Sequence, residues 1–584
     1  MKFISTNLAS RLAGALLFAM AGSLVVSCSK DQDKNGLEQT GETKISVSIA
    51  GIDERPVVDA SKKAAAAPQA SQKITSYGDF DVQVAYDNQI QSRSNKLKIK
   101  GSNAANGAGL KAAAIDANTK YSLYLYKDGA FVSATELVAG TPGEIAIEKG
   151  ASYTWSAVSL NSETSVPAFD AANPVLAIPE GTDVLYASGE LNVASDATTI
   201  ALPVTFKHQN SRIAIELNTM GMFGNMTAAT VAVSGLTTQT GDLNVVTGEW
   251  SNLQAGTQTI DFADFENIDP AYSDAKVAYV YTVASETANT VGVSIGGLTV
   301  AHADGVDRVF PATPVAFAPI AVTPVNGSTH ALTYNLIESP IVTGSGATAV
   351  RWARSNLYYE AGHNPYRFYA NNVQTLATES KGLFAFGGTI PRKFATDGIQ
   401  DPCELVYPAG VWRQPTNTEF APLTTSNGLL TNVLGNILGL LVPAPAPNAT
   451  GNATNGTFID YAAAVTAGSG NTAFGAESNT LRFPLNGQIT NINVLTDVGP
   501  DGLIELTLGN SHGRDVALWT NVQGVDLLGL AGVGSWAYFG GRRSTVLGSR
   551  FMGAQGTVEA LSNVDLLGID AVSSTFKNVR CVRN

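Results

Sequence analysis

Side chains that could perform acid–base, nucleophilic or metal chemistry are few and scattered in this 584-residue chain. The five histidines are far apart, so no His-Glu-x-x-His motif occurs, and three cysteines are too few for a multi-cysteine zinc cluster. No Ser/His/Asp order, nucleophile elbow, phosphate-binding loop or paired-carboxylate context stands out. The runs His512-Gly513-Arg514 and His302-Ala303-Asp304 are typical of surface or loop residues. We therefore predict that the protein is not an enzyme and has no catalytic residue, metal or cofactor.

One cysteine, Cys28, follows a sequence that is typical of secreted proteins. A positively charged start precedes a nearly apolar stretch, Leu12 to Val26, which is too short for a membrane-spanning helix and is typical of a secretion signal. The stretch ends in Ser27-Cys28, and a small residue before a cysteine at this place resembles the lipobox of bacterial lipoproteins. The resemblance implies that residues 1–27 are a signal peptide and that Cys28 becomes the acylated, palmitate-bearing first residue. The alternative is an ordinary signal peptide in which Cys28 is incidental.

The segment that follows is polar. Residues 28–43 are expected to form a tether, and Ser29 to Asp33 resembles the acidic tag that exports such lipoproteins to the cell surface. No other run reaches the roughly 18 apolar residues of a membrane-spanning helix. We therefore expect an outer-membrane lipoprotein precursor whose mature form is anchored by lipid at the cell surface or is released by cleavage.

Composition and charge restrict the possible partners and the fold class. The formal net charge is -13 and the pI is about 4.9, which argues against nucleic acid as a partner because phosphate binding needs a basic face. With 44% hydrophobic residues the chain is not disordered. The 57 glycines and 24 prolines, with abundant Ala, Thr, Asn and Val, indicate many short strands joined by turns.

Strand patterns divide the chain into three units. Strict alternation in Lys44–Ile49 begins the first unit, expected over 44–200, and a hairpin is expected around Asp128-Gly129. The second unit is expected over 201–335 as an antiparallel sandwich. The third, over 340–584, holds four of the six tryptophans. Its leucine-rich stretch 429–441 predicts one helix, packed on its own unit or exposed as a contact surface.

Two segments in the first two units carry a resemblance. The strand Lys44–Ile52, together with the lipobox at Cys28, and the segment Val204 to Leu217 (VTFKHQNSRIAIEL) resemble the fimbrillin superfamily, subunits of the type V fimbriae of Bacteroidetes. The resemblance covers roughly 30–335 and implies two transthyretin-like β-sandwiches. It also implies assembly with other fimbrial subunits by strand exchange, in which a protease removes the first strand and a neighbouring subunit fills the groove.

The third unit carries a second resemblance. Its Arg351–Leu357 stretch, an Asp-Pro-Cys at 401–403, a Pro-Ala-Gly-x-Trp-Arg-x-Pro-Thr block at 408–416 and the closing Val579–Arg583 resemble the Fibrobacter succinogenes major paralogous domain. The resemblance implies a C-type-lectin-like α+β fold and places Cys403 and Cys581 at the two cysteine positions of that domain. An oxidising periplasm then favours a disulfide between them over two buried thiols. Sulfatase-activating enzymes share this broad lectin-like fold and use a reactive cysteine pair. An enzyme of that type is a further alternative, and it would need both cysteines free.

The resemblances together predict a fimbrial accessory or tip subunit that mediates adhesion to a host or bacterial surface receptor through its C-terminal domain. Processing would follow an arginine, with Arg55 and Arg93 as candidates and Lys62-Lys63 as a weaker one, although Pro56 after Arg55 resists most such proteases. The alternative is a stand-alone surface lipoprotein that binds glycans. In the third unit Trp352 and Trp412 are expected in the core, whereas the candidates for ligand contact are Trp536, Tyr538 and Arg542.

Overall fold

The computed structural model describes thirteen ranges of the chain, and every structural statement below concerns these ranges: 41–58, 74–86, 114–256, 258–285, 288–393, 399–424, 449–451, 456–494, 504–523, 534–545, 548–559, 564–566 and 569–584. Within them the chain is mainly β, as predicted, and its one α-helix is the short α2 (Asn417–Phe420). No helix in these ranges is long and apolar enough to cross a membrane. The predicted helix at 429–441 lies outside the described residues.

The N-terminal unit is built on a seven-stranded sheet with the order β5-β4-β7-β9-β10-β1-β6. The predicted hairpin joins β4 to β5, where Asp128 and Gly129 both take the positive φ (52° and 78°) that such a turn requires. The strands are β1 (Glu42–Ile52), β4 (Lys120–Lys127), β5 (Ala130–Val138), β6 (Gly143–Glu148), β7 (Ser152–Ser159), β9 (Leu185–Asn192) and β10 (Thr199–His208).

Both faces of this sheet carry buried apolar side chains. One face carries an apolar core to which Ile45, Leu123 and Phe206 contribute. The other face packs Tyr124 and Tyr186 against a small sheet of β8 (Val175–Ala177), β13 (Thr238–Asn244) and β14 (Trp250–Gly256). The second face is only partly covered, because this small sheet is short.

The central unit is a sandwich of a six-stranded and a five-stranded sheet that enclose one apolar core. It was expected to be antiparallel, but β11 and β21 pair in parallel, so the six-stranded sheet is mixed. Its order is β15 (Glu266–Asp269), β16 (Tyr272–Thr282), β11 (Ser211–Gly221), β21 (Thr329–Glu338), β3 (Phe80–Tyr86) and β2 (Ile74–Ser76). The facing sheet holds β12 (Gly224–Ser234), β17 (Asn289–His302), β18 (Asp307–Val309), β19 (Val315–Ala316) and β20 (Ile320–Val322).

Strand pairing crosses the unit boundaries expected from the sequence. Residues 74–86 were expected in the first unit, but β3 pairs along β21 in the central sheet. The expected division at 200/201 falls inside β10, which belongs to the first sheet. The chain therefore runs from the N-terminal unit to the central unit and back before it enters β4. Alternation along a strand reveals its buried face, but it does not reveal its partner.

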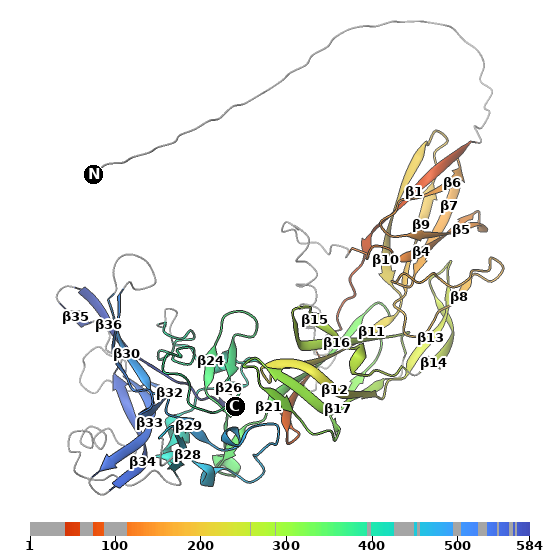
Figure 1. The fold of residues 1–584 in the computed structure, drawn as a ribbon. Coiled ribbons are helices and arrows are strands. Elements are labelled where there is room, and N and C mark those ends of the chain that lie inside the picture. The colour runs from red at the N-terminus through yellow and green to blue at the C-terminus, as the bar shows by residue number, and fades with distance from the viewer. Residues whose placement is uncertain are drawn as a thin grey trace, which may run out of the picture.

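The C-terminal unit, which begins at Ile341, consists of small sheets and short 3-10 turns, and Figure 1 shows it beyond the central unit. In its described part the helical content is low, and the expected α+β lectin-like fold stays a prediction. Its sheets contain β22 (Ile341–Thr343), β23 (Val350–Trp352), β37 (Val582–Arg583) and β26 (Trp412–Arg413); β24 (Leu357–Tyr359) and β25 (Tyr366–Phe368); β27 (Thr450–Gly451), β28 (Phe458–Asp460) and β29 (Arg482–Pro484); β31 (Ile504–Asn510), β30 (Gln488–Val494), β36 (Ile569–Lys577) and β35 (Val564–Leu566); and β32 (Asp515–Gln523), β33 (Gly534–Thr545) and β34 (Gly548–Glu559).

Candidate functional site

The first strand of the chain lies inside a sheet, and this position makes it a candidate for exchange. β1 pairs in parallel with β10 over Lys44 to Ile52 and antiparallel with β6 over Glu42 to Val47. Because β6 has no other neighbour in this sheet, β1 alone connects it to the remaining five strands. Removal of β1 would leave two rows of unpaired backbone groups facing a slot one strand wide.

The side chains of β1 anchor it in the core by strict alternation. Thr43, Ile45 and Val47 are buried, and Ile45 and Val47 pack in the apolar core of the unit. Lys44 and Ser48 point to solvent, and Lys44 pairs with Glu144 on β6 at 2.8 Å. A replacement strand would therefore need apolar side chains at every second position and could vary at the others.

A buried polar group follows β1 directly. We call Arg55, Asp183, His208 and Asn210 the Arg55 cluster. Arg55 is 3% exposed, forms an ion pair with Asp183 and donates to the backbone carbonyl of Asn210 and, at 2.9 Å, to its Oδ1. His208 Nδ1 lies 2.9 Å from Asp183 Oδ1. The cluster fastens the end of β1 to the end of β10 and to the chain before β9.

The electrostatics of the Arg55 cluster favour an ionised carboxylate. Burial alone would raise the pKa of Asp183, but the hydrogen bond with His208 and the charge of Arg55 outweigh it, so that this pKa falls to about 2. Burial lowers the pKa of His208, and the hydrogen bond with Asp183 offsets part of that change. From the sequence, Arg55 was predicted as a protease site, and His208 and Asn210 belong to the segment that resembles fimbrillins, whereas Asp183 was not singled out.

The segment behind Arg55 joins the N-terminal unit to the central unit. Asp53 N–H donates to Phe206 in β10, whereas Val58 N–H donates to Thr329 in β21, and Thr329 N–H donates to Pro56. Residues 53–58 are thus fixed at both ends. A protease that recognises arginine must take the side chain into its own pocket, and Arg55 is not accessible in this conformation. Arg93, Lys62 and Lys63 lie outside the described residues, as does Cys28.

The C-terminal strand is held by a disulfide and by buried hydrogen bonds. Cys403 and Cys581 form the predicted disulfide, with a Cα–Cα distance of 5.7 Å. The last strand, β37, lies between β23 and β26, in the middle of its sheet. Arg580 is fully buried and donates to the carbonyls of Ala353 and Arg482 and to two asparagine side chains. The C-terminus therefore cannot leave without unfolding the unit.

Charged contacts also bind the C-terminal unit to the central unit. Arg583 pairs with Asp81 of β3 and donates to the carbonyl of Glu338 in β21, while Arg308 of β18 donates to the carbonyl of Ala370 at 3.1 Å. All of these side chains are buried. Across the same junction, Phe474 of the C-terminal unit packs in the apolar core of the central unit. Figure 1 accordingly shows the C-terminus beside β21 and β26, at the junction.

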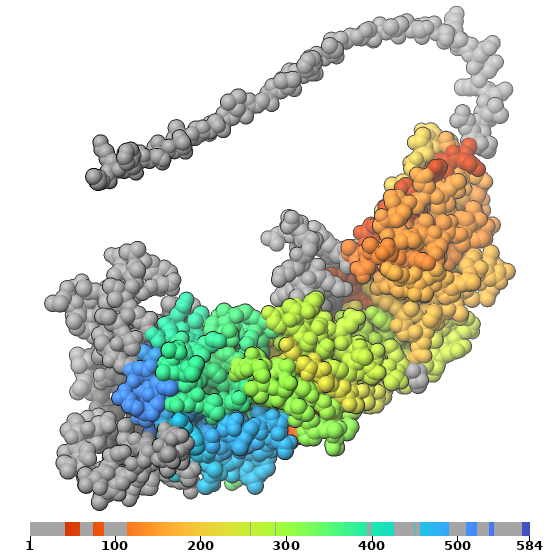
Figure 2. Space-filling model, viewed as in Figure 1, coloured from red at the N-terminus to blue at the C-terminus, as the bar shows by residue number. Residues whose placement is uncertain are grey.

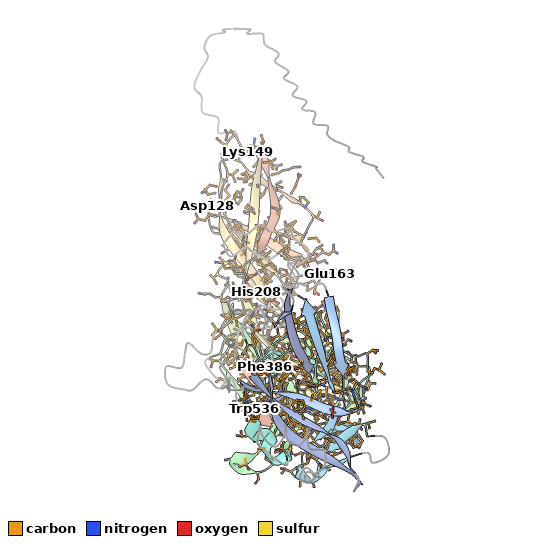
Figure 3. All side chains as sticks on the ribbon, turned by 90° about the vertical axis from the view of Figure 1, so that its left-hand side faces the viewer. Asp128, Lys149, Glu163, His208, Phe386 and Trp536 are labelled. Atoms are coloured by element: carbon orange, nitrogen blue, oxygen red, sulfur yellow. A yellow bond between two sulfur atoms is a disulfide. The ribbon has the colours of Figure 1, made fainter. Side chains whose placement is uncertain are left out.

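The predicted ligand residues of the C-terminal unit do not form one surface. Tyr538 is fully buried, and its hydroxyl lies 2.5 Å from that of Tyr461, so the expected ligand role of Tyr538 is wrong. Trp536 of β33 is partly exposed, and Figure 3 shows it in the C-terminal unit, far from Asp128 and Lys149. The backbone of Arg542 pairs with Phe551 of β34, and its side chain lies outside the description. Trp352 and Trp412 are buried, as predicted.

The described residues contain no group of three or more potential metal ligands.

Residues 84–352 match the family model of fimbrillin-like proteins, and this match spans slightly less than half of the chain. This match supports the fimbrillin resemblance of the N-terminal and central units and leaves the C-terminal unit without a family. No curated protein matches the chain.

Several solved structures resemble the chain at low identity. A protein from Bacteroides fragilis NCTC 9343, named for a role in cell adhesion, shares 11% identity with a TM-score of 0.31, over 53% of this chain and 96% of that one. A fimbrial assembly protein from Parabacteroides distasonis ATCC 8503 shares 10% with a TM-score of 0.24, over 54% and 94%. The fimbrial anchor protein of Porphyromonas gingivalis shares 14% with a TM-score of 0.20, over 36% and 78%. The scores are low, and the fold described above does not depend on them.

Proposed function

We propose that this chain is a fimbrillin-like protein of the cell surface that sits at the tip, or in an accessory position, of a fimbrium. One observation carries the proposal: β1 fills an internal slot of the first sheet, whereas the last strand is held by a disulfide and by buried arginines. Such a chain can accept a strand from a neighbour, and its strand β37 is not available for donation. It would therefore end a polymer built by strand exchange.

Processing would release β1 by cleavage behind it. A cut between Val58 and β2 would free β1 alone. A cut at Arg93 would also separate β2 and β3 from the rest, and β3 contributes Phe80 and Val82 to the central core. We therefore favour a cut within residues 59–73, which contain Lys62 and Lys63, over one at Arg93.

The C-terminal unit would carry adhesion. The disulfide joins the two cysteine positions of the lectin-like domain that the sequence resembles, and both motif tryptophans are in its core, which supports that fold as part of the proposal. The receptor would contact exposed parts of this unit, for which Trp536 and Arg542 remain candidates. Before processing, the chain would be an outer-membrane lipoprotein attached through Cys28.

A second function competes with the first. A stand-alone surface lipoprotein that binds glycans would keep β1 permanently, and the Arg55 cluster, which fastens the end of β1, favours that function. In this case no neighbour would ever occupy the slot.

The test is to shear filaments from the cells that make this protein, to find the chain in them, and to sequence its N-terminus. A filament-borne chain that starts behind Val58 supports strand exchange. A chain found only in outer membranes, still acylated at Cys28 and retaining β1, contradicts the tip position and leaves the glycan-binding lipoprotein.

A further inference from the structure

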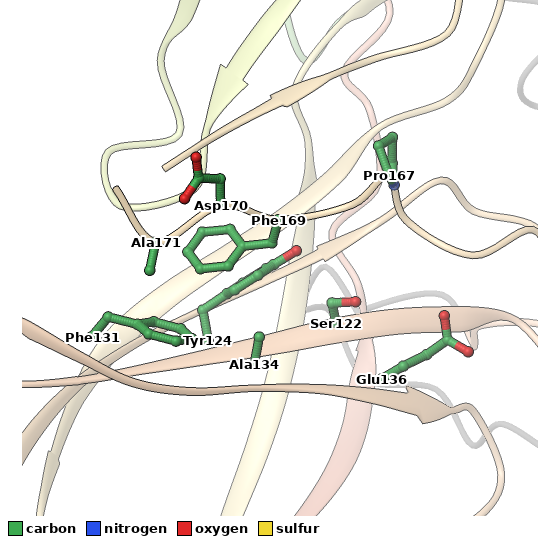
Figure 4. Close-up of a pocket in the computed structure, with 9 residues that line it drawn as sticks. All are labelled: Ser122, Tyr124, Phe131, Ala134, Glu136, Pro167, Phe169, Asp170 and Ala171. Carbon is green, nitrogen blue, oxygen red and sulfur yellow. The ribbon is translucent and has the colours of Figure 1, made fainter. Parts of the chain in front are cut away.

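A groove of about 670 Å³ opens on the second face of the seven-stranded sheet, outside the strand-exchange site. Its floor is β4, one wall is the edge strand β5, and the other wall is the loop around Phe169 that precedes β8. Figure 4 shows the loop arching over the two strands. Three strands, β7, β9 and β10, separate β4 from β1, so the groove would be unchanged by replacement of β1.

Strand register places the lining side chains on one face. The cross-strand pairs Tyr126 with Phe131, Tyr124 with Ala134, and Ser122 with Glu136 follow one another along β4 and β5. The small side chain of Ala134, between Phe131 and Glu136, leaves the space between the two strands and the loop open. The groove therefore has an aromatic end and a hydrogen-bonding end.

The aromatic end is a rigid platform. Phe169 lies 4.7 Å from Tyr124 and 5.0 Å from Phe131, measured between ring centroids, and Phe131 also contacts Tyr126 edge-on at 5.8 Å. Despite these contacts, 37% of Phe131 is exposed. An aromatic ring that is held by its neighbours and open on one side offers an apolar face at little cost in side-chain entropy.

The polar end carries no net charge. Glu136 pairs with Lys120 at 3.5 Å, and Lys120 donates to Ser165 at 3.0 Å, while Ser122 adds a hydroxyl. The other acidic lining residue, Asp170, accepts a hydrogen bond from Ala172 N–H within its own turn. The acceptor oxygens of Glu136 and Ser122, beside the ammonium donor of Lys120, suit a neutral ligand with many hydroxyls.

We propose that this groove, which we call the β4–β5 groove, is a binding subsite for one neutral pyranose residue of a glycan. A pyranose presents C–H bonds on one face and hydroxyls at its edge. The face would lie on Phe131 and Phe169, and the edge hydroxyls would donate to Glu136 and accept from Lys120. The subsite does not depend on strand exchange, and it holds for a fimbrial subunit and for a stand-alone lipoprotein.

Saturation-transfer NMR on the full chain tests the proposal with four probes, the methyl glycosides of glucose, galactose, mannose and N-acetylglucosamine. We expect at least one probe to receive saturation mainly on the C–H protons of one ring face. Phe131→Ala should weaken its Kd about fivefold or more, because an aromatic contact is worth roughly 1 kcal/mol. Phe131→Tyr, which keeps the ring, should bind within about twofold of the native chain.

The matched control is Val132→Ala, because Val132 is the next residue, is 47% exposed and does not line the groove. This variant should bind as the native chain does. Glu136→Gln should also weaken binding, since a neutral amide is a weaker acceptor than a carboxylate. Circular dichroism of each variant confirms that the strands are retained.

Three outcomes would overturn the proposal. The first is that none of the four glycosides binds more tightly than about 10 mM. The second is equal binding by the Phe131→Ala and Val132→Ala variants. The third is that spermidine, a cationic probe, binds the groove in a Phe131-dependent manner where the glycosides do not.

Discussion

At the scale of single residues, the most informative finding concerns Arg55. An arginine after an N-terminal strand invites the interpretation of a protease site, yet this one is buried and paired with Asp183. Its surroundings come from residues 128 and 155 positions away in the sequence, Asp183 and Asn210. No local pattern around Arg55 could have predicted these partners, because they meet only when β10 lies beside β1.

Replacing Arg55 tests the Arg55 cluster. Arg55→Ala would remove the guanidinium that pairs with the buried carboxylate of Asp183. Breaking a buried pair in this way costs about 3 kcal/mol or more. We expect backbone amides of β1 and β10 to exchange hydrogen much faster than in the native chain, as measured by mass spectrometry. Lys44→Ala removes an exposed ion pair on β1 and serves as the control, with unchanged exchange. Equal exchange in both variants would contradict a stabilising role of Arg55.

His302 provides a pH test in the central unit. It is buried, accepts the Asp304 N–H at Nδ1, and its pKa is lowered well below the usual value by burial and by the charges of Arg308 and Arg367. The unfolded chain binds a proton there near pH 6.5 and the folded chain does not, so stability is present above that pH and falls below it. We expect a loss of about 1.4 kcal/mol between pH 7.5 and 5.5 from this group.

The measurement is the unfolding midpoint of the native chain and of His302→Asn across this pH range. Asparagine keeps an acceptor for Asp304 N–H and does not titrate. The midpoint of the variant should fall less on acidification. Parallel pH profiles for the two proteins would show that His302 is not responsible.

At the scale of elements, the sequence predicted strands far better than their partners. The alternation of residues 44–49 corresponds to β1, and the Asp128-Gly129 turn corresponds to the hairpin of β4 and β5. The pairing of β3 with β21 joins residues about 250 positions apart, and alternation carries no information about it. The ligand role of Tyr538 failed for a related reason: the residue type does not show which face of its strand is buried, and Tyr538 lies on the buried face.

The role of β1 can be tested with two neighbouring substitutions. Val47→Asp places a charge in the core of the N-terminal unit, which costs roughly 3 kcal/mol or more, whereas Ser48→Asp places the same charge in solvent. We expect faster hydrogen exchange in β6 and β10 for Val47→Asp and native exchange for Ser48→Asp. If β6 remains protected in Val47→Asp, β1 is not what connects it to the sheet.

At the scale of the whole molecule, the three units form a row (Figure 2). Polar contacts join their neighbouring ends. The first junction uses residues 53–58, and the second uses the contacts of Arg583 with Asp81 and Glu338 and of Arg308 with Ala370. The disulfide was predictable through the resemblance of its two motifs, whereas these junctions were not, since buried ion pairs leave no periodic signal. Such junctions would suit the proposed role, in which the last unit is presented at a distance from the cell.

Removal of Arg583 should uncouple the last two units. Arg583→Ala leaves the buried carboxylate of Asp81 unpaired, at a cost of about 3 kcal/mol or more. In calorimetry we expect the central and C-terminal units to unfold at more widely separated temperatures than in the native chain. Arg514→Ala, at an exposed position of the C-terminal unit, should leave the profile unchanged. An unaltered profile for Arg583→Ala would show that the junction is held by its apolar contacts alone.

The disulfide near the C-terminus also determines how the chain would respond to tension. Because Cys403 and Cys581 are 178 positions apart, the stretch between them forms a closed covalent loop. A pull applied between the N-terminus and the C-terminus bypasses that loop, which hides about 600 Å of contour length. In single-molecule pulling, reduction should lengthen the fully extended chain by this amount. If a cell in flowing liquid were attached through this protein, the disulfide-closed loop of the C-terminal unit would therefore not be extended, even after the other two units had unfolded.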